Sequence, residues 1–230
     1  MKKSVIISNC VIVAMLLTLV ALSYSNAIAL NVKADARVIY AGNTNQNKVS
    51  FMINVYQNEE CVLDMMDIFD AYKVKATFFV GGCWAVKHLD VVEQICSRGF
   101  EIGNHGFHHK EHNKLSFEAN TQEIKACHDV LLKNFGVEMT LFAPPSGAYN
   151  KTTVAAAESL NYKTIMWTHD TIDWRDQNED LIFKRATKDL SNGDLILMHP
   201  TPKTVLALTK ILAYSINNGF EPTTVSACLA

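Results

Sequence analysis

The sequence predicts an α/β domain whose strands run parallel. Seven short apolar runs alternate with longer helical stretches, and this alternation is typical of consecutive βαβ units. The runs are apolar at consecutive positions, as expected for strands that helices cover on both faces or that a barrel encloses. In barrels of this kind the chemistry lies at the C-terminal ends of the strands, so the residues that close each run are the candidates for a functional site.

The predicted domain extends over residues 48–226, and an Asn-rich stretch at 30–47 precedes it as a predicted linker. No internal repeat or low-complexity segment divides it. The helical stretches include 120–135 and 205–218, both of them longer than a typical strand. The predicted strands are 48–55, 76–80, 100–104, 141–145, 164–170, 195–199 and 223–226.

The N-terminal sequence predicts export. Lys2 and Lys3 precede an apolar run at 5–22, and a small-x-small pattern follows at 27–29. The run is about as long as a short transmembrane helix requires, so 1–29 is either a signal peptide or an N-terminal membrane anchor. Both alternatives place the rest of the chain outside the cytoplasm, secreted or membrane-anchored, because the flanking lysines stay inside.

The composition argues against a nucleic-acid partner. The 230 residues carry a formal net charge of -2 and lack the clustered Lys and Arg of a nucleic-acid surface. Six cysteines are present, of which Cys10 lies in the predicted export segment, and no pair has CxxC spacing. We therefore expect most of the others to be buried free thiols rather than disulfides or zinc ligands.

Two histidines follow the predicted strand 100–104. His105 and His109 are four residues apart in GNHGFHH, and this spacing places two imidazoles on one side of a helical turn. Neutral imidazole is a good ligand for zinc, so the pair is a candidate metal site. A solvated polar loop is the alternative, because His108 and His112 crowd the same stretch.

A third histidine, His199, closes the strand 195–199. It is a candidate general acid if a carboxylate orients its second ring nitrogen. Asp170, at the end of the preceding predicted strand, is the expected partner. Turn capping is the alternative for Asp170 and Asp173, since aspartate favours turns.

Five short motifs follow one another along the predicted domain: KATFFVGG, EIGNHGFHH, FAPPSGAYN, DTIDW and LILMH. In this order they resemble the motifs of the NodB-homology polysaccharide deacetylases, carbohydrate esterase family four. The resemblance covers about residues 48 to 226. It implies that the α/β domain is a distorted (β/α)7 barrel of the NodB type.

The resemblance also implies an activity, the hydrolysis of N-acetyl groups on a glycan such as peptidoglycan or a chitin-like polymer. It assigns His105 and His109 to a divalent metal such as zinc, which polarises the acetamide and activates a water. It makes His199 the catalytic acid that protonates the leaving amine. The groove residues that it implies are Pro144, Pro145, Tyr149, Asp173 and Trp174.

The end of the first strand departs from the family pattern. That strand normally ends Thr-Phe-Asp-Asp-Gly, where the first Asp is the catalytic base and the second is a metal ligand. The aligned residues are 52–56, so Asn54 stands at the base position and Val55 at the ligand position. An amide accepts no proton at neutral pH, and valine has no donor atom.

The arginine that pairs with the base in the family is replaced as well, by Ala143. Both members of that ion pair are therefore lost together, which avoids an unpaired buried charge. The combination of MINV and APPSG is similar to a deacetylase-like branch of endospore formers related to the sporulation protein YlxY.

Three functions stay open. The favoured one is a deacetylase homologue of impaired or atypical activity, with its metal weakly bound or absent. In a rebuilt site Glu59 or Glu60 would supply the missing carboxylate, although a solvated helix N-terminus is the preferred interpretation of both. The second is a catalytically inactive, glycan-binding pseudo-enzyme of the cell envelope. A structural or interaction protein ranks last.

Overall fold

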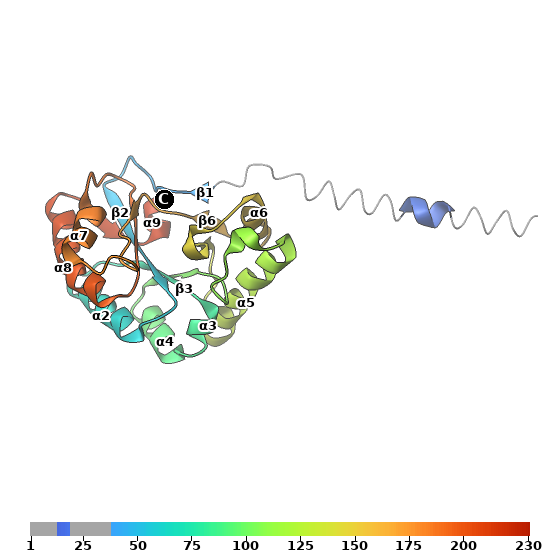
Figure 1. Ribbon diagram of the computed structural model, residues 1–230, viewed down its shortest axis with the longest axis horizontal. Coiled ribbons are helices and arrows are strands. Elements are labelled where there is room, and N and C mark those ends of the chain that lie inside the picture. Colours follow the sequence, from blue (N-terminus) through green and yellow to red (C-terminus); the bar gives the residue numbers. More distant parts are fainter. Residues whose placement is uncertain (1–12, 19–37) are drawn as a thin grey trace, which may run out of the picture. The chain divides into compact units, whose positions relative to one another are not determined.

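The computed structural model describes residues 13–18 and 38–230 (Figure 1). Residues 13–18 form a short helical stretch, and a separate compact unit starts at Arg37 and runs to Ala230. Most of the predicted export segment lies outside the described residues. Within the described ranges, no helix is long and apolar enough to cross a membrane.

One parallel sheet organises the unit that starts at Arg37. Its order is β1-β6-β5-β4-β3-β2-β8-β7, with β9 pairing β2. The sheet curls, and helices surround it on the outside (Figure 1), which confirms the predicted α/β barrel class. The strands are β1 Val38–Ile39, β2 Lys48–Val55, β3 Thr77–Val80, β4 Glu101–Asn104, β5 Leu141–Phe142, β6 Lys163–Ile165, β7 His169–Asp170, β8 Leu195–Met198 and β9 Glu221–Thr223.

Five of the helices, α5 to α9, begin at polar capping residues. Ser116, Asn150, Asn178, Thr201 and Thr224 each accept a backbone N–H of the helix that follows, which satisfies donors that have no partner inside the helix. The helices are α2 Glu59–Ala71, α3 Gly82–Ala85, α4 Leu89–Ser97, α5 Phe117–Phe135, α6 Lys151–Ser159, α7 Glu179–Thr187, α8 Pro202–Asn217 and α9 Val225–Leu229, with 3-10 turns at His112–Lys114 and Pro145–Gly147.

Strand β2 separates two cores. Its side chains alternate between faces, as in any strand, and Phe51, Ile53 and Val55 belong to the large core between sheet and helices. Met52 belongs to the smaller cluster inside the barrel. Asn54, two residues further on, therefore points along the barrel interior toward its rim, whereas Val55 points away from it.

The predicted strand 164–170 is in fact two strands. β6 pairs with β5 and with the edge strand β1, whereas β7 pairs with β8 and forms the other edge of the sheet. The segment between β6 and β7 connects the two edges of the sheet, because Met166 N–H donates to the Ile39 carbonyl and Thr168 N–H donates to the Leu195 carbonyl. The apolar run looked continuous because both strands are short and the crossing segment is itself apolar.

The domain boundary lies earlier than residue 48. Val38–Ile39 pairs with β6, Gly42 N–H donates to Gly193, and Asn43 N–H donates to Cys228. Residues 38–47, expected to be linker, are thus part of the sheet domain. Side chains of Tyr40, Asn43 and Asn47 add hydrogen bonds to distant residues, but the polar, Asn-rich sequence does not indicate those partners.

The five cysteines of the described domain are free thiols, as expected. Cys61, Cys127 and Cys228 are buried. Burial raises the pKa of Cys127 to about 12, so this thiol is protonated and unreactive at neutral pH.

The pair formed by His169 and Asp194 should make stability depend on pH. His169 donates through Nε2 to Asp194 at 2.9 Å and through Nδ1 to the Arg185 carbonyl at 3.1 Å, so only the imidazolium satisfies both acceptors. The hydrogen bond to Asp194 raises the pKa of His169 above 6.5. Its stabilisation is therefore present below that pH and is lost as pH rises through the raised pKa.

Urea denaturation at a series of pH values from about 6 to 9 tests this expectation. The unmodified protein should lose more stability over this range than His169→Gln, which cannot titrate. Parallel pH profiles for the two proteins would contradict a charged His169.

Candidate active site

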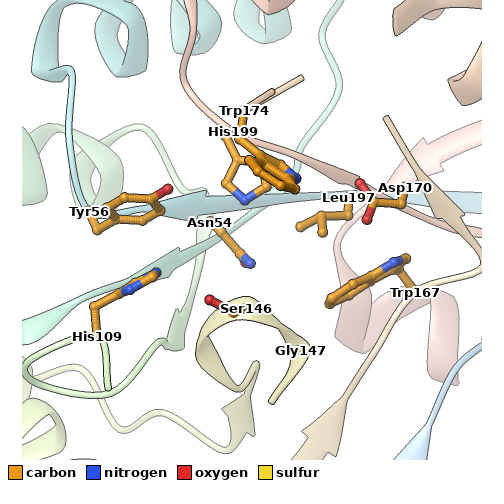
Figure 2. Close-up of a pocket in the computed structure, with 10 residues that line it drawn as sticks. All are labelled: Asn54, Tyr56, His109, Ser146, Gly147, Trp167, Asp170, Trp174, Leu197 and His199. Carbon is orange, nitrogen blue, oxygen red and sulfur yellow. The ribbon is translucent and has the colours of Figure 1, made fainter. Parts of the chain in front are cut away.

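A pocket of about 330 Å³ opens at the C-terminal ends of the strands (Figure 2). Asn54 comes from the end of β2, Asp170 from the end of β7, and His199 follows β8 directly. This is the rim where the strand-end rule placed the functional residues. The lining residues are Asn54, Tyr56, His109, Ser146, Gly147, Trp167, Asp170, Trp174, Leu197 and His199.

His199 is held by Asp173 and not by Asp170 as expected. His199 Nδ1 donates to Asp173 Oδ1 at 2.8 Å, and the His199 backbone N–H donates to Asp173 Oδ2 at 2.7 Å. Thr204 Oγ1 also donates to Asp173 Oδ2, at 2.7 Å. Asp173 is fully buried, so the predicted contact of this residue with substrate is replaced by an orienting role.

Asp170 has a different partner. Its Oδ1 accepts the Ile172 backbone N–H at 2.8 Å, the turn-capping alternative, and its side chain lines the pocket opposite Tyr56 in Figure 2. The chain turns sharply here, since Ile172 has φ 52, and this turn brings Asp173 beneath His199. Sequence order alone favoured Asp170 because it directly closes a strand.

The structure brings His105 and His109 together, with ring centroids 5.1 Å apart. His105 Nδ1 donates to the Ala143 carbonyl at 2.7 Å, so the second ring nitrogen, Nε2, is unprotonated and carries a free lone pair. That Nε2 is buried and has no hydrogen-bond partner within the described part of the chain. Burial lowers the pKa of His105 well below its usual range and also lowers the pKa of His109, so both are neutral at pH 7.

Two imidazoles on one tetrahedral zinc would have ring centres roughly 5 Å apart, so this pair alone is compatible with a shared ion. A third ligand is missing: over 13–18 and 38–230 no group of three or more His, Cys, Asp or Glu side chains could hold a metal. The Val55 side chain is fully buried in the helix-side core. The residues present therefore do not complete a metal site, and the ligand roles of His105 and His109 stay predictions.

Glu59 and Glu60 do not fill the gap. Both are exposed in the first turn of α2, and neither lines the pocket. Their carboxylates lie where the helix dipole favours negative charge. The preferred interpretation of these two residues is thus confirmed, and neither of them replaces the carboxylate missing at position 55.

Asn54 occupies the position of the family's base. Asn54 is 2% exposed, and its Oδ1 has no hydrogen-bond partner among the described residues. Ala143, where the family has arginine, is fully buried in the interior cluster with Met52 and Phe79. Residues 54 and 143 therefore do not supply the proton acceptor and the cation that the family pattern has at these two positions.

The groove wall differs from the prediction. Pro144 and Pro145 are buried beneath the wall, and the Tyr149 hydroxyl is hydrogen-bonded to Tyr40. The surface that faces the pocket comes instead from the following residues Ser146 and Gly147. The prolines shape this wall because they end β5 and start a tight turn.

Three aromatic side chains line the pocket. Trp174 was predicted, and it is 54% exposed at the mouth. Tyr56 and Trp167 were not predicted. Trp167 lies on the segment that joins β6 to β7, and the interpretation of 164–170 as one strand concealed it. A signal for Tyr56 existed in the sequence, since it replaces the glycine of the family motif.

Gly147 should be essential for the wall. It has φ +62, and a Cβ at this position would lie 2.8 Å from Trp167 Cη2. Gly147→Ala is therefore expected to displace Trp167 from the pocket wall. The free energy of unfolding should fall by more than the roughly 1–2 kcal/mol that a left-handed conformation costs any non-glycine residue.

Gly136→Ala is the matched control for Gly147→Ala. Gly136 has φ +67, and a Cβ there meets nothing within 4 Å. In thermal unfolding Gly136→Ala should lose only the backbone contribution and Gly147→Ala should lose more, and only Gly147→Ala should lose affinity, in calorimetric titration, for the glycan that the resemblance implies. Equal affinity of both variants would contradict a wall built by Gly147 and Trp167.

Fold and site together define an α/β barrel domain with an aromatic pocket and an oriented histidine at the C-terminal ends of its strands. The polysaccharide deacetylase family matches residues 41–165. The chain belongs to this family, as its motifs predicted.

Similar proteins include active and inactive members. The chain is 34% identical to the uncharacterized protein YlxY of Bacillus subtilis over 82% of its own length, and it spans 59% of the length of YlxY. It is 30% identical to a peptidoglycan-N-acetylglucosamine deacetylase of Bacillus cereus, over 72% of this chain and 80% of that one.

The fold is also similar to the crystal structure of BA3943 of Bacillus anthracis, described as a pseudoenzyme of carbohydrate esterase family four. The TM-score is 0.83 at 30% identity, over 85% of this chain and 70% of that one. A BA3943 mutant described as having restored enzymatic activity has the same TM-score of 0.83, at 28% identity, over 85% of this chain and 72% of that one.

Proposed function

We propose that this domain binds an N-acetylated glycan of the cell wall or spore and hydrolyses its N-acetyl groups far more slowly than an intact family member does. The observation that carries the proposal is the half-complete pocket. The oriented His199 and the aromatic walls are present, whereas Asn54 stands where a base would be.

The acid side supports amide hydrolysis. Asp173 fixes the His199 tautomer by accepting from Nδ1, so Nε2 faces the pocket and can carry a proton to a leaving amine. The exposed indole of Trp174 offers an apolar face to a sugar ring. The names of relatives support peptidoglycan as the glycan, since those relatives are peptidoglycan deacetylases. The predicted export segment and these cell-wall substrates favour action outside the cytoplasm.

A second candidate is a glycan-binding protein without turnover. The missing third metal ligand among the described residues favours it, and so does the likeness to a pseudoenzyme. The two candidates share the pocket and differ only in whether acetate is released.

Acetate release and glycan binding, measured on the same purified protein, test the proposal. The substrates would be oligomers of N-acetylglucosamine and purified peptidoglycan. We expect saturable binding that Trp174→Ala weakens about tenfold, and acetate release about 10²–10⁴-fold slower than that of the Bacillus cereus relative.

Acetate release at the rate of that relative would contradict the impairment. Binding without any acetate release would support the second candidate. No saturable binding of either glycan would overturn both.

A further inference from the structure

The side chain of Tyr56 occupies the middle of the histidine cluster. Its ring lies on His109, with centroids 4.1 Å apart and planes tilted by 41°. The same ring is 6.3 Å from His105 and 6.3 Å from His199. Figure 2 shows Tyr56 above His109, with its hydroxyl directed into the pocket on the side of His199 and away from His109.

Strand alternation explains why Tyr56 points there. Val55 belongs to the helix-side core, so the next residue faces the opposite side, toward the barrel rim. Tyr56 lines the pocket with Asn54, two positions earlier on the same face. A residue without a side chain at position 56, such as the glycine of the family motif, would leave the His109 ring face open to the pocket.

The contact with His109 is made by the face of the tyrosine ring. Because the hydroxyl points away from His109, the phenol does not replace the missing third ligand of the His105–His109 pair. The ring instead lies against His109, which itself lines the pocket, and adds an aromatic surface to the same pocket as Trp167 and Trp174.

We propose that Tyr56 closes the His105–His109 pair against metal ions and converts that side of the pocket into a stacking surface for the apolar face of an N-acetylhexosamine. This inference deepens the proposed function and rests on it for the glycan. The metal-excluding part is independent of any glycan. The ring thereby adds a steric barrier to a histidine pair that already lacks a third ligand among the described residues, and it makes the pocket aromatic on three sides.

The test compares Tyr56→Gly, Tyr56→Ala and Tyr56→Phe with the unmodified protein. Cobalt binding would be followed by visible absorption, zinc binding by calorimetry, and binding of tri-N-acetylchitotriose by calorimetry. Urea denaturation would show that each variant is folded, because glycine adds backbone freedom to the unfolded chain and lowers stability. Tyr56→Ala removes the ring with less backbone freedom, so the test does not depend on one variant.

Both variants without a ring should bind cobalt and zinc about tenfold tighter or more, the range in which groups around metal ligands act. They should bind the trisaccharide about tenfold more weakly. Tyr56→Phe should match the unmodified protein in both titrations, since the ring and not the hydroxyl makes the contacts.

The control is Trp174→Ala, which removes an aromatic wall away from the histidine pair. This variant should weaken binding of the trisaccharide and leave cobalt binding unchanged. Unchanged metal affinity in both ringless variants would overturn the inference, whatever the glycan data show. Weaker metal binding in Tyr56→Phe would overturn it as well, because it would make the phenol a ligand. If the unmodified protein binds no glycan but the ringless variants bind metal more tightly, the proposed function fails and the metal-excluding role of Tyr56 stands.

Discussion

Asp173→Ala is expected to destabilise the domain by about 3–5 kcal/mol, since it removes the only carboxylate from a fully buried polar cluster. Three donors lose their acceptor in this variant: the backbone N–H of His199, its Nδ1, and the hydroxyl of Thr204. A buried donor without an acceptor costs about 1–3 kcal/mol by itself. Urea denaturation measures the loss directly.

Asp173→Asn is the matched control for shape. Its amide oxygen still accepts from the His199 backbone or from Thr204, but its NH₂ group cannot accept from His199 Nδ1. We expect a smaller loss of stability than in Asp173→Ala, together with a reversed His199 tautomer visible in ¹⁵N NMR of the imidazole. Equal stability of Asp173→Ala and the unmodified protein would show that His199 is held by something else.

Rebuilding the base side should raise acetate release about 10²–10⁴-fold, but only when several residues change together. Asn54→Asp alone should leave the rate nearly unchanged. Its carboxylate would be almost fully buried, since position 54 is 2% exposed, and Ala143 supplies no cation to it; burial without a cation keeps such a group protonated. The combination of Asn54→Asp with Val55→Asp, Tyr56→Gly and Ala143→Arg supplies base, ligand, space and cation.

Val55→Asp needs Tyr56→Gly beside it. Position 55 faces the helix-side core, so a carboxylate there reaches the rim only if the strand ends one residue earlier, and glycine at position 56 permits that turn. By itself, Val55→Asp should destabilise the domain, because it buries an unpaired charge. The effects of the four substitutions should be strongly non-additive.

Acetate release from peptidoglycan would be compared for the single, double and fourfold variants. The fourfold variant carrying His199→Ala as well is the control, and it should lose the gain. The restored BA3943 mutant shows that a related domain can regain activity by substitution. Full activity in Asn54→Asp alone would mean that positions 55, 56 and 143 are not part of one unit with it.

The sequence by itself determined the fold class, the family and the deficit at the end of β2. Alternation of apolar runs with helical stretches can be read from the sequence without knowing any tertiary contact, and it predicted the parallel barrel. The ordered motifs predicted the family that residues 41–165 match. The sequence alone also shows what is missing at Asn54, Val55 and Ala143, since an amide and two apolar groups cannot act as base, ligand or cation.

Only the tertiary structure decided which side chains meet. Asp173 lies under His199 because a turn at Ile172 reverses the chain, and the spacing of Asp170 and Asp173 does not encode that turn. Trp167 faces the pocket because one apolar run divides between two edges of a curled sheet. Residues 38–47 join the domain through strand pairing and through hydrogen bonds to residues far along the chain, and composition does not indicate those partners. The Tyr56 ring lies against His109 because β2 stays extended through Val55, and the residue that follows Val55 therefore points to the pocket side. The direction of that one side chain decides that an aromatic ring lies beside the histidine pair.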